Sequence, residues 1–230
     1  MKLSKLLGSL ALLASLAAAV GCKSAAFTPS NAQIRVMNAS VQQPNLAVLL
    51  NTTTLATSLA FPTATTYTSE PPGGYTIHIE PSGTTTTLIN QPVVFQNATS
   101  YTMIATEAAF ASPALTPILL TDDNTPPTSG QMKLRVVNAS PDLGNVDVYV
   151  VAPNAGIQNA TPAFTNVAFK TAAGYNTLAP GNYQLVFTAT GQKNVLLNSG
   201  TVRFAAGQIR TVVALDSSGG YTTATLNDLN

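Results

Sequence analysis

The stretch that decides the fold is Leu134-Arg135-Val136-Val137-Asn138-Ala139-Ser140, because the chain carries the same pattern earlier as Ile34-Arg35-Val36-Met37-Asn38-Ala39-Ser40. Three more landmarks recur in the same order: Pro72-Gly73-Gly74-Tyr75 with Pro180-Gly181-Asn182-Tyr183, Tyr101 to Ala105 with Arg210 to Ala214, and Leu120-Thr121-Asp122 with Leu226-Asn227-Asp228. The spacing of about a hundred residues indicates duplicated domains, since solenoid units run about 20–50 residues.

The duplication divides most of the chain into two repeats, residues 32–123 and 132–230. Residues 124–131 form the linker between them, where Pro126 and Pro127 restrict the backbone. We expect each repeat to be a folding unit of its own, because a linker rich in proline and polar residues is typical of a domain boundary.

Strands are the expected secondary structure of both repeats. Apolar side chains alternate with other residues at 75–80, 146–151 and 183–188, which is the period of a strand with a buried face. Pro-Gly and Ser-Ser-Gly-Gly segments separate such stretches. The fold class is therefore all-β: two tandem antiparallel β-sandwiches, immunoglobulin-like or prealbumin-like, after a signal peptide.

Two short motifs have a structural interpretation. The sequence from Leu178 to Tyr183 resembles the tyrosine corner of such sandwiches, in which the tyrosine hydroxyl bonds nearby backbone. Tyr75 has the same Pro-Gly setting, with Glu70 in place of the leucine. Asn38 and Asn138 begin Asn-Ala-Ser triplets like glycosylation sequons, but we expect both side chains to bond local backbone where a strand ends.

The first 21 residues read as a signal peptide, with Lys2 and Lys5 before an uncharged run that is short for a bilayer. The run ends at Cys22, and Ala19 to Cys22 resembles a bacterial lipobox. That resemblance implies cleavage before Cys22 and a lipid on its thiol, with residues 22–31 as a tether. Lys23, in place of an inner-membrane retention aspartate, favours the outer membrane or cell surface. The alternative is a leader cut elsewhere, with a free thiol at Cys22.

Composition excludes several classes of protein. Only 8% of the residues are charged while 45% are apolar, so a core can form and the polar surface must be largely uncharged. Removing Lys2 and Lys5 with the leader leaves 8 basic and 9 acidic side chains, a net charge of −1. Such a surface does not favour nucleic acid, and we expect no nucleotide or cofactor because no glycine-rich phosphate loop occurs. One cysteine excludes an internal disulfide.

A family resemblance rests on the start of the second repeat, from Leu134 through Pro141-Asp142 to Val146-Asp147-Val148-Tyr149. This stretch is similar to a bacterial envelope family defined only as a domain of unknown function, whose members open with R-V-[VI]-[NH]-A-S-P-D and continue with V-D-[VI]-Y. The first repeat follows that pattern only as far as Ser40. The resemblance implies an exported β-sandwich and implies no activity.

The residues show no catalytic constellation, so we expect neither an enzyme nor a metal site. His78, the single histidine, falls on the outer face of its strand, and we expect Glu70, Glu80 and Glu107 to be solvated. Residues 122–124, Asp-Asp-Asn, leave a calcium ion between the repeats as an alternative, although no EF-hand loop accompanies them.

The leading hypothesis is a lipid-anchored envelope protein that acts as a binding, adhesion or structural module, with an envelope protein or glycan as partner. Its contacts would come from the end loops 108–117, 141–145 and 154–166. The alternative is a carbohydrate-active or other hydrolytic enzyme using Glu80 or Glu107, with Tyr149 or Tyr175 stacking on sugar in the absence of tryptophan. A cleft holding two facing carboxylates would favour the enzyme.

Overall fold

A computed structural model of the chain describes residues 30–229, and strands are the only regular elements in that range. The all-β prediction is therefore confirmed. The signal peptide, Cys22 and nearly all of the proposed tether lie outside the described residues, so nothing in the structure bears on them.

The first repeat contains eight strands in two sheets that pack face to face. One sheet has the order β4-β1-β7-β8 and the other the order β3-β2-β5-β6. The bounds are β1 Ala32–Asn38, β2 Asn45–Leu50, β3 Thr53–Ala60, β4 Thr68–Glu70, β5 Gly73–Pro81, β6 Ile89–Phe95, β7 Ser100–Glu107 and β8 Leu115–Asp122.

The second repeat has the same plan, with two short strands where the first has β4. Its sheets have the orders β12-β9-β16-β17, with β13 also pairing with β9, and β11-β10-β14-β15. The bounds are β9 Met132–Asn138, β10 Val146–Val151, β11 Phe164–Val167, β12 Thr171–Ala172, β13 Asn176–Leu178, β14 Gly181–Ala189, β15 Val195–Phe204, β16 Ile209–Ser217 and β17 Gly220–Leu229.

The landmarks found in the sequence are neighbours in the sheets. Strand β1 pairs in parallel with β7, so that Asn38 faces Ala105, and β9 pairs in parallel with β16, so that Asn138 faces Ala214. The other strand pairs are antiparallel. The matching registers confirm that the two repeats are aligned as the sequence landmarks indicate.

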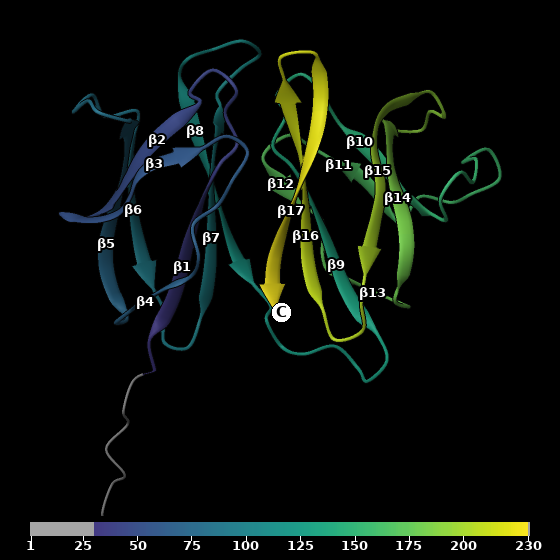
Figure 1. Cartoon of the computed structure of the whole chain (residues 1–230), viewed down its shortest axis with the longest axis horizontal. Coiled ribbons are helices and arrows are strands. Elements are labelled where there is room, and N and C mark those ends of the chain that lie inside the picture. Colours follow the sequence, from purple (N-terminus) through teal and green to yellow (C-terminus); the bar gives the residue numbers. More distant parts are fainter. Residues whose placement is uncertain (1–29, 230) are drawn as a thin grey trace, which may run out of the picture.

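The four sheets stack as four layers, visible side by side in Figure 1, with β4-β1-β7-β8 and β12-β9-β16-β17 as the inner pair. Each repeat has its own apolar core, which includes Ile34 and Phe95 in the first and Leu134 and Phe187 in the second. A third buried cluster lies between the two inner sheets. It contains residues of both repeats: Met37, Ala39, Ile104, Ile118, Val137, Ala139, Val213, Leu215 and Leu226.

Strand alternation explains the third cluster. Ile34 and Val36 point into the core of the first repeat, so Arg35 and Met37 point to the opposite face of β1 and meet the second repeat. Because one residue in two on an inner strand faces the other repeat, both faces of the inner sheets are buried. The repeats therefore share an extensive apolar surface in addition to the linker.

Both tyrosine corners have the expected geometry. The Tyr183 hydroxyl donates to the carbonyl oxygen of Ala179 at 2.9 Å, and the Tyr75 hydroxyl donates to that of Pro71 at 2.9 Å. The predicted bond from Tyr183 to the preceding turn is confirmed. Replacing the leucine by Glu70 in the first repeat leaves the same bond in place. Both rings are half-buried, and each packs near a buried phenylalanine.

Candidate functional site

The arginine of the repeated motif lies at the junction of the two repeats. Nε of Arg35 donates to the Thr102 hydroxyl at 2.8 Å within the first repeat. Its other two nitrogens reach the second repeat, where Nη1 donates to the Asn227 carbonyl oxygen at 2.7 Å and Nη2 forms an ion pair with Asp228. One side chain of the first repeat thus contacts the last strand of the second.

Arg135 makes the equivalent contacts in the opposite direction. Its Nε donates to the Thr211 hydroxyl at 2.9 Å, its Nη1 to the Thr121 carbonyl oxygen at 3.2 Å, and its Nη2 to Asp122 at 2.5 Å. The arginine of each repeat therefore pairs with the aspartate that ends the other. This reciprocal pairing is the mark of an interface with two-fold symmetry, here between two halves of one chain.

A tyrosine completes each half of the network. The hydroxyls of Tyr67 and Tyr175 donate to Asp122 and Asp228, each at 2.7 Å, and each tyrosine ring lies 4.6 Å from an arginine guanidinium carbon. Burial is the main cause that raises the pKa of both tyrosines well above the ordinary value of 10.0. Both hydroxyls therefore stay protonated and act as donors.

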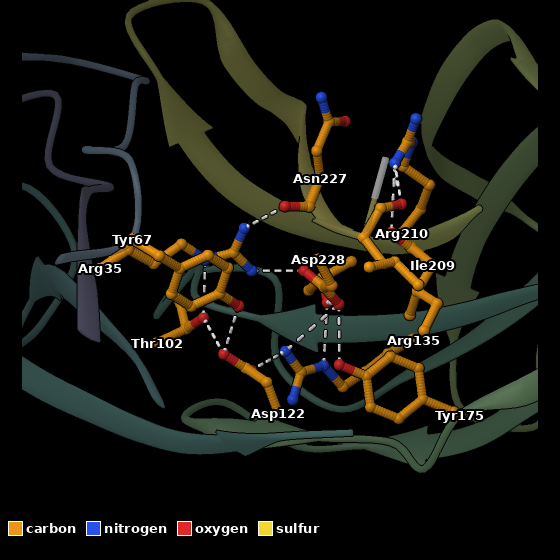
Figure 2. A network of polar contacts seen from close by, with 12 residues as sticks. Arg35, Tyr67, Thr102, Asp122, Arg135, Tyr175, Ile209, Arg210, Asn227 and Asp228 are labelled. Atoms are coloured by element: carbon orange, nitrogen blue, oxygen red, sulfur yellow. Dashed lines mark hydrogen bonds and ion pairs between the residues drawn. The ribbon is translucent and has the colours of Figure 1, made fainter. Parts of the chain in front are cut away.

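The network is neutral and internally satisfied. Figure 2 shows the two guanidinium groups and the two carboxylates interleaved, with Tyr67 and Tyr175 on opposite flanks. All four charged side chains are buried, and Thr102 and Thr211 also donate to the two carboxylates at 2.6 Å. Buried charges persist when they are paired and hydrogen-bonded, and here the polar atoms are used up within the protein.

The two aspartates of the calcium alternative each have a cationic partner. Asp122 is held by Arg135 in the network, and Asp123 forms an ion pair of 2.6 Å with Lys133. Within residues 30–229, no group of three or more histidine, cysteine, aspartate or glutamate side chains is placed to hold a metal ion.

The remaining motif residues lie at the other end of β1 and β9 and shape two turns. The Oδ1 of Asn38 accepts from the Ser40 amide at 3.0 Å, and that of Asn138 accepts from the Ser140 amide at 3.1 Å. Their Nδ2 atoms donate to carbonyl oxygens of Gln43 and Gly144, among others. The expectation that these asparagines bond local backbone is confirmed.

Each motif serine contacts a buried carboxylate at this end. The Ser40 hydroxyl donates to Glu107 Oε1 at 2.9 Å, and the Ser140 hydroxyl donates to Asp216 Oδ1. Glu107 and Asp216 follow Ala105 and Ala214 by two residues, so they occupy equivalent positions in the two repeats. The expectation that Glu107 is solvated is wrong, because its side chain lies at the junction and is only 1% exposed.

Both carboxylate residues line a pocket of about 320 Å³ formed by the two repeats together. The first repeat contributes the turn after β1 and the loop after β7, and the second contributes the turn between β16 and β17. The lining residues are Val41, Gln42, Glu107, Phe110, Ala111, Asp216, Ser217 and Ser218. Phe110 is 67% exposed, which is unusual for an aromatic side chain and places an apolar surface at the pocket.

The two carboxylates differ in how they are held. Glu107 Oε1 accepts from the Ser40 hydroxyl at 2.9 Å and from the Gln42 amide at 3.1 Å. Asp216 is 5% exposed, and its Oδ2 has no hydrogen-bond partner. Burial, opposed by the Ser140 bond and reinforced by the negative charges of Glu107 and Asp142, raises the pKa of Asp216 above its ordinary value.

Other residues singled out in the sequence are not brought together. His78 is half-buried on the outer face of β5, between the core residues Ile77 and Ile79, as expected. Glu70 and Glu80 are half-buried and do not line this pocket. Tyr149 is covered by the 154–166 loop, and Tyr175 belongs to the charge network, so neither is free to stack on a sugar.

The loop at 154–166 is fastened to its sheet. Ile157 packs on Tyr149, and the Lys193 ammonium donates to the carbonyl oxygens of Ile157 and Ala160 at 2.7 and 2.6 Å. Of the three loops expected to carry contacts, this one is therefore closed against the protein. The 108–117 loop, which carries Phe110, presents the most prominent exposed side chain.

Sequence reasoning missed the two arginines, Asp216 and the pairing of Asp122 with Arg135. A signal for the arginines was present in the sequence. Arg35 and Met37 share one face of β1, and an apolar residue on the supposed outer face of a strand indicates that both of its faces are buried.

No helix among the described residues is long and apolar enough to cross a membrane.

Comparisons with solved structures give weak likenesses. The C-terminal domain of AlgF from P. aeruginosa is 13% identical with a TM-score of 0.29, and the match covers 44% of this chain and 99% of that one. A family CBM26 module from Eubacterium rectale Amy13K, solved with maltoheptaose, is 10% identical with a TM-score of 0.26, over 86% and 98% of the two chains. At these TM-scores neither likeness bears on what this chain binds.

Comparison with curated proteins gives no match, whereas a protein-family model does match. The family is described as "Domain of unknown function (DUF4397)", and its model matches residues 32–149 and 153–230. The two segments cover most of the chain and include both copies of the arginine motif, both aspartates of the charge network and both carboxylates of the pocket. The chain belongs to the DUF4397 family.

Proposed function

We propose that this protein is a non-catalytic binding module of the bacterial envelope, anchored in the outer membrane by a lipid on Cys22. The observation that carries the binding role is the pocket built jointly by the two repeats around Glu107 and Asp216. A pocket of about 320 Å³ lies at the small end of the range of ligand sites, which is about 300–1,000 Å³. Its partner would be a protein or glycan of the envelope.

The charge network supports a rigid module. Its arginines, aspartates and tyrosines are buried and bonded to one another, so they hold the repeats in place and leave no free group for chemistry. A fixed junction keeps the two halves of the pocket in register, which favours binding by pre-organisation. The lipobox-like sequence before Cys22 supports the anchor, and several acyl chains at about 0.8 kcal/mol per buried CH₂ hold a protein firmly in a membrane.

Fractionation tests the anchor. The native chain should be recovered in the outer-membrane fraction with a lipid-modified Cys22 as its N-terminus, as measured by mass spectrometry. The Cys22→Ser variant should leave the membrane fraction or keep its leader. An unmodified thiol at Cys22 of the mature native protein would contradict the proposal.

Hydrolysis is the second candidate function, because two carboxylate residues line one pocket. Asp216, with its raised pKa, would be the general acid, and Glu107, which accepts from the Ser40 hydroxyl and the Gln42 amide, would be the base or nucleophile. We favour binding because each carboxylate accepts from a serine hydroxyl of the repeated motif, a structural role that the equivalent residues share in both repeats.

An activity assay separates the two candidates. Aryl glycosides and envelope glycans incubated with the purified protein should be recovered intact. Turnover that disappears in both Glu107→Gln and Asp216→Asn, and persists in Glu80→Gln, would establish the enzyme and overturn the binding module.

A further inference from the structure

The pocket between the repeats has an unbalanced charge. At the network end of the interface two arginines neutralise two aspartates. At the pocket end, neither Glu107 nor Asp216 has a lysine or arginine nitrogen of the described residues within 4.0 Å. Every ion pair among the described residues involves Asp122, Asp123 or Asp228 instead. Two buried carboxylates without a counter-charge are costly, and a cationic ligand would relieve that cost.

Asp216 supplies an open acceptor. Its Oδ1 is used by the Ser140 hydroxyl, but Oδ2 has no partner although the side chain is 95% buried. A buried acceptor that lacks a hydrogen bond destabilises the folded state. Since Asp216 also lines the pocket, a donor entering the pocket is the natural partner for this oxygen.

The other walls determine which cation fits. Phe110 gives an exposed aromatic surface and Val41 an apolar one, while Ser217 and Ser218 are small and polar. A calcium or magnesium ion takes six or more oxygen ligands, usually with several carboxylates, and among the described residues no group of three or more histidine, cysteine, aspartate or glutamate side chains is placed to hold a metal ion. An ammonium group on an alkyl chain matches better, because its donors suit the carboxylates and its methylene groups suit Phe110 and Val41.

We propose that the pocket between the repeats binds a primary alkylammonium group, the chemistry of a lysine side chain, with Asp216 and Glu107 as its counter-charges and Phe110 as the apolar wall. This inference rests on the proposed binding function and names the ligand class of the same site. The ammonium would donate to Asp216 Oδ2, and Glu107 would contribute its charge from the opposite repeat.

Titration of the full chain in detergent with n-butylammonium chloride, followed by NMR or calorimetry, tests the proposal. Binding should saturate, weaken with added NaCl, and be absent with n-butanol, which has the same chain without the charge. Asp216→Asn should weaken binding by about tenfold, because a charge-assisted bond is lost. Phe110→Ala should weaken it by about threefold, the effect of an exposed cation–π contact.

Glu80→Gln is the matched control, since it removes a carboxylate of the first repeat outside the pocket and should bind as the native chain does. Unchanged thermal unfolding would show that the Phe110→Ala fold is intact. Equal binding of n-butanol, or native affinity in both Asp216→Asn and Glu107→Gln, would overturn the proposal. Saturable binding of CaCl₂ that is lost in the same variants, without butylammonium binding, would make the pocket a metal site instead. Either failure would leave the anchored module and its fractionation test untouched.

Discussion

Arg35 and Asp228 form a buried ion pair although 193 residues separate them in the chain. The pair joins the first strand of the first repeat to the last strand of the second, and Arg135 with Asp122 repeats it in the opposite sense. Replacing a buried ion pair by apolar residues is often neutral, but removing one partner leaves an uncompensated charge. The two ion pairs therefore specify the relative placement of the repeats more than they add net stability.

Removing Arg35 alone should be strongly destabilising. Arg35→Met leaves Asp228 buried with one charged partner fewer, and we expect a loss of about 3–5 kcal/mol in the free energy of unfolding. Denaturant unfolding measures this loss. The pair of Asp123 with Lys133 is the control, because its carboxylate is half exposed and Lys133→Met should cost only about 1 kcal/mol. Similar losses in the two variants would contradict the structural role of the network.

The second repeat expressed alone, as residues 132–230, should fold and form a dimer. It would otherwise expose Val137, Val213 and Leu215 to water. The two-fold symmetry of the junction offers a replacement, since Arg135 of one copy can pair with Asp228 of another as Arg35 does in the native chain. Light scattering coupled to size exclusion should give twice the monomer mass.

Arg135→Glu should abolish that dimer, because it places two negative charges where an ion pair is needed. A native-like fragment that stays monomeric at high concentration would show that the shared apolar cluster is dispensable. A fragment that fails to fold at all would mean that the two repeats depend on one continuous core, against our expectation of separate folding units.

Asp216 should make the protein less stable as the pH rises. Burial raises its folded pKa above the ordinary value of 3.8, so the folded state holds this proton more tightly than the unfolded state. Its contribution to stability is complete below the unfolded pKa and is lost as the pH rises through the folded pKa. Asp216→Asn removes that loss, so its melting temperature should exceed that of the native chain near neutral pH and approach it in acid.

The expected gain can be read from melting curves between pH 3 and 8. A gain of about 1 kcal/mol would raise the melting temperature by about 2–4 °C for a chain of this size. Glu80→Gln, outside the pocket, should follow the native curve. A variant that is less stable than the native chain at pH 7 and above would show that the ionised Asp216 is better accommodated than its contacts suggest.

The two tyrosine corners should contribute similar amounts to the stability of the fold. Tyr183→Phe and Tyr75→Phe each remove one bond of 2.9 Å to a carbonyl oxygen, and each should cost about 0.5–1.5 kcal/mol. Glu70 in place of the corner leucine does not alter the bond, so the two variants should lose similar amounts of stability. Thermal unfolding of the two variants checks this, and a change in n-butylammonium binding without a change in stability would contradict a structural role.

The local pattern of the sequence determined the class of the fold. The two-residue alternation at 75–80 and 183–188 specifies strands with a buried face, since successive side chains of a strand point to opposite sides. The duplicated motif specified which strands correspond. Tyr183 and Asn138 could be assigned roles because the Tyr183 hydroxyl bonds a residue four positions away and Asn138 Oδ1 accepts from the amide two positions on, distances that short-range patterns can predict.

Only the tertiary structure decided what the repeats do to each other. The main carboxylate partners of Arg35 and of Arg135 lie in the opposite repeat, and no spacing rule relates Arg35 to Asp228, which is 193 positions away. Glu107 follows a buried strand like many solvated glutamates, and it is buried because a second sheet packs over its end. The pocket exists for the same reason, since its walls come from both repeats and their packing depends on three-dimensional shape and charge that the order of residues along one strand does not encode.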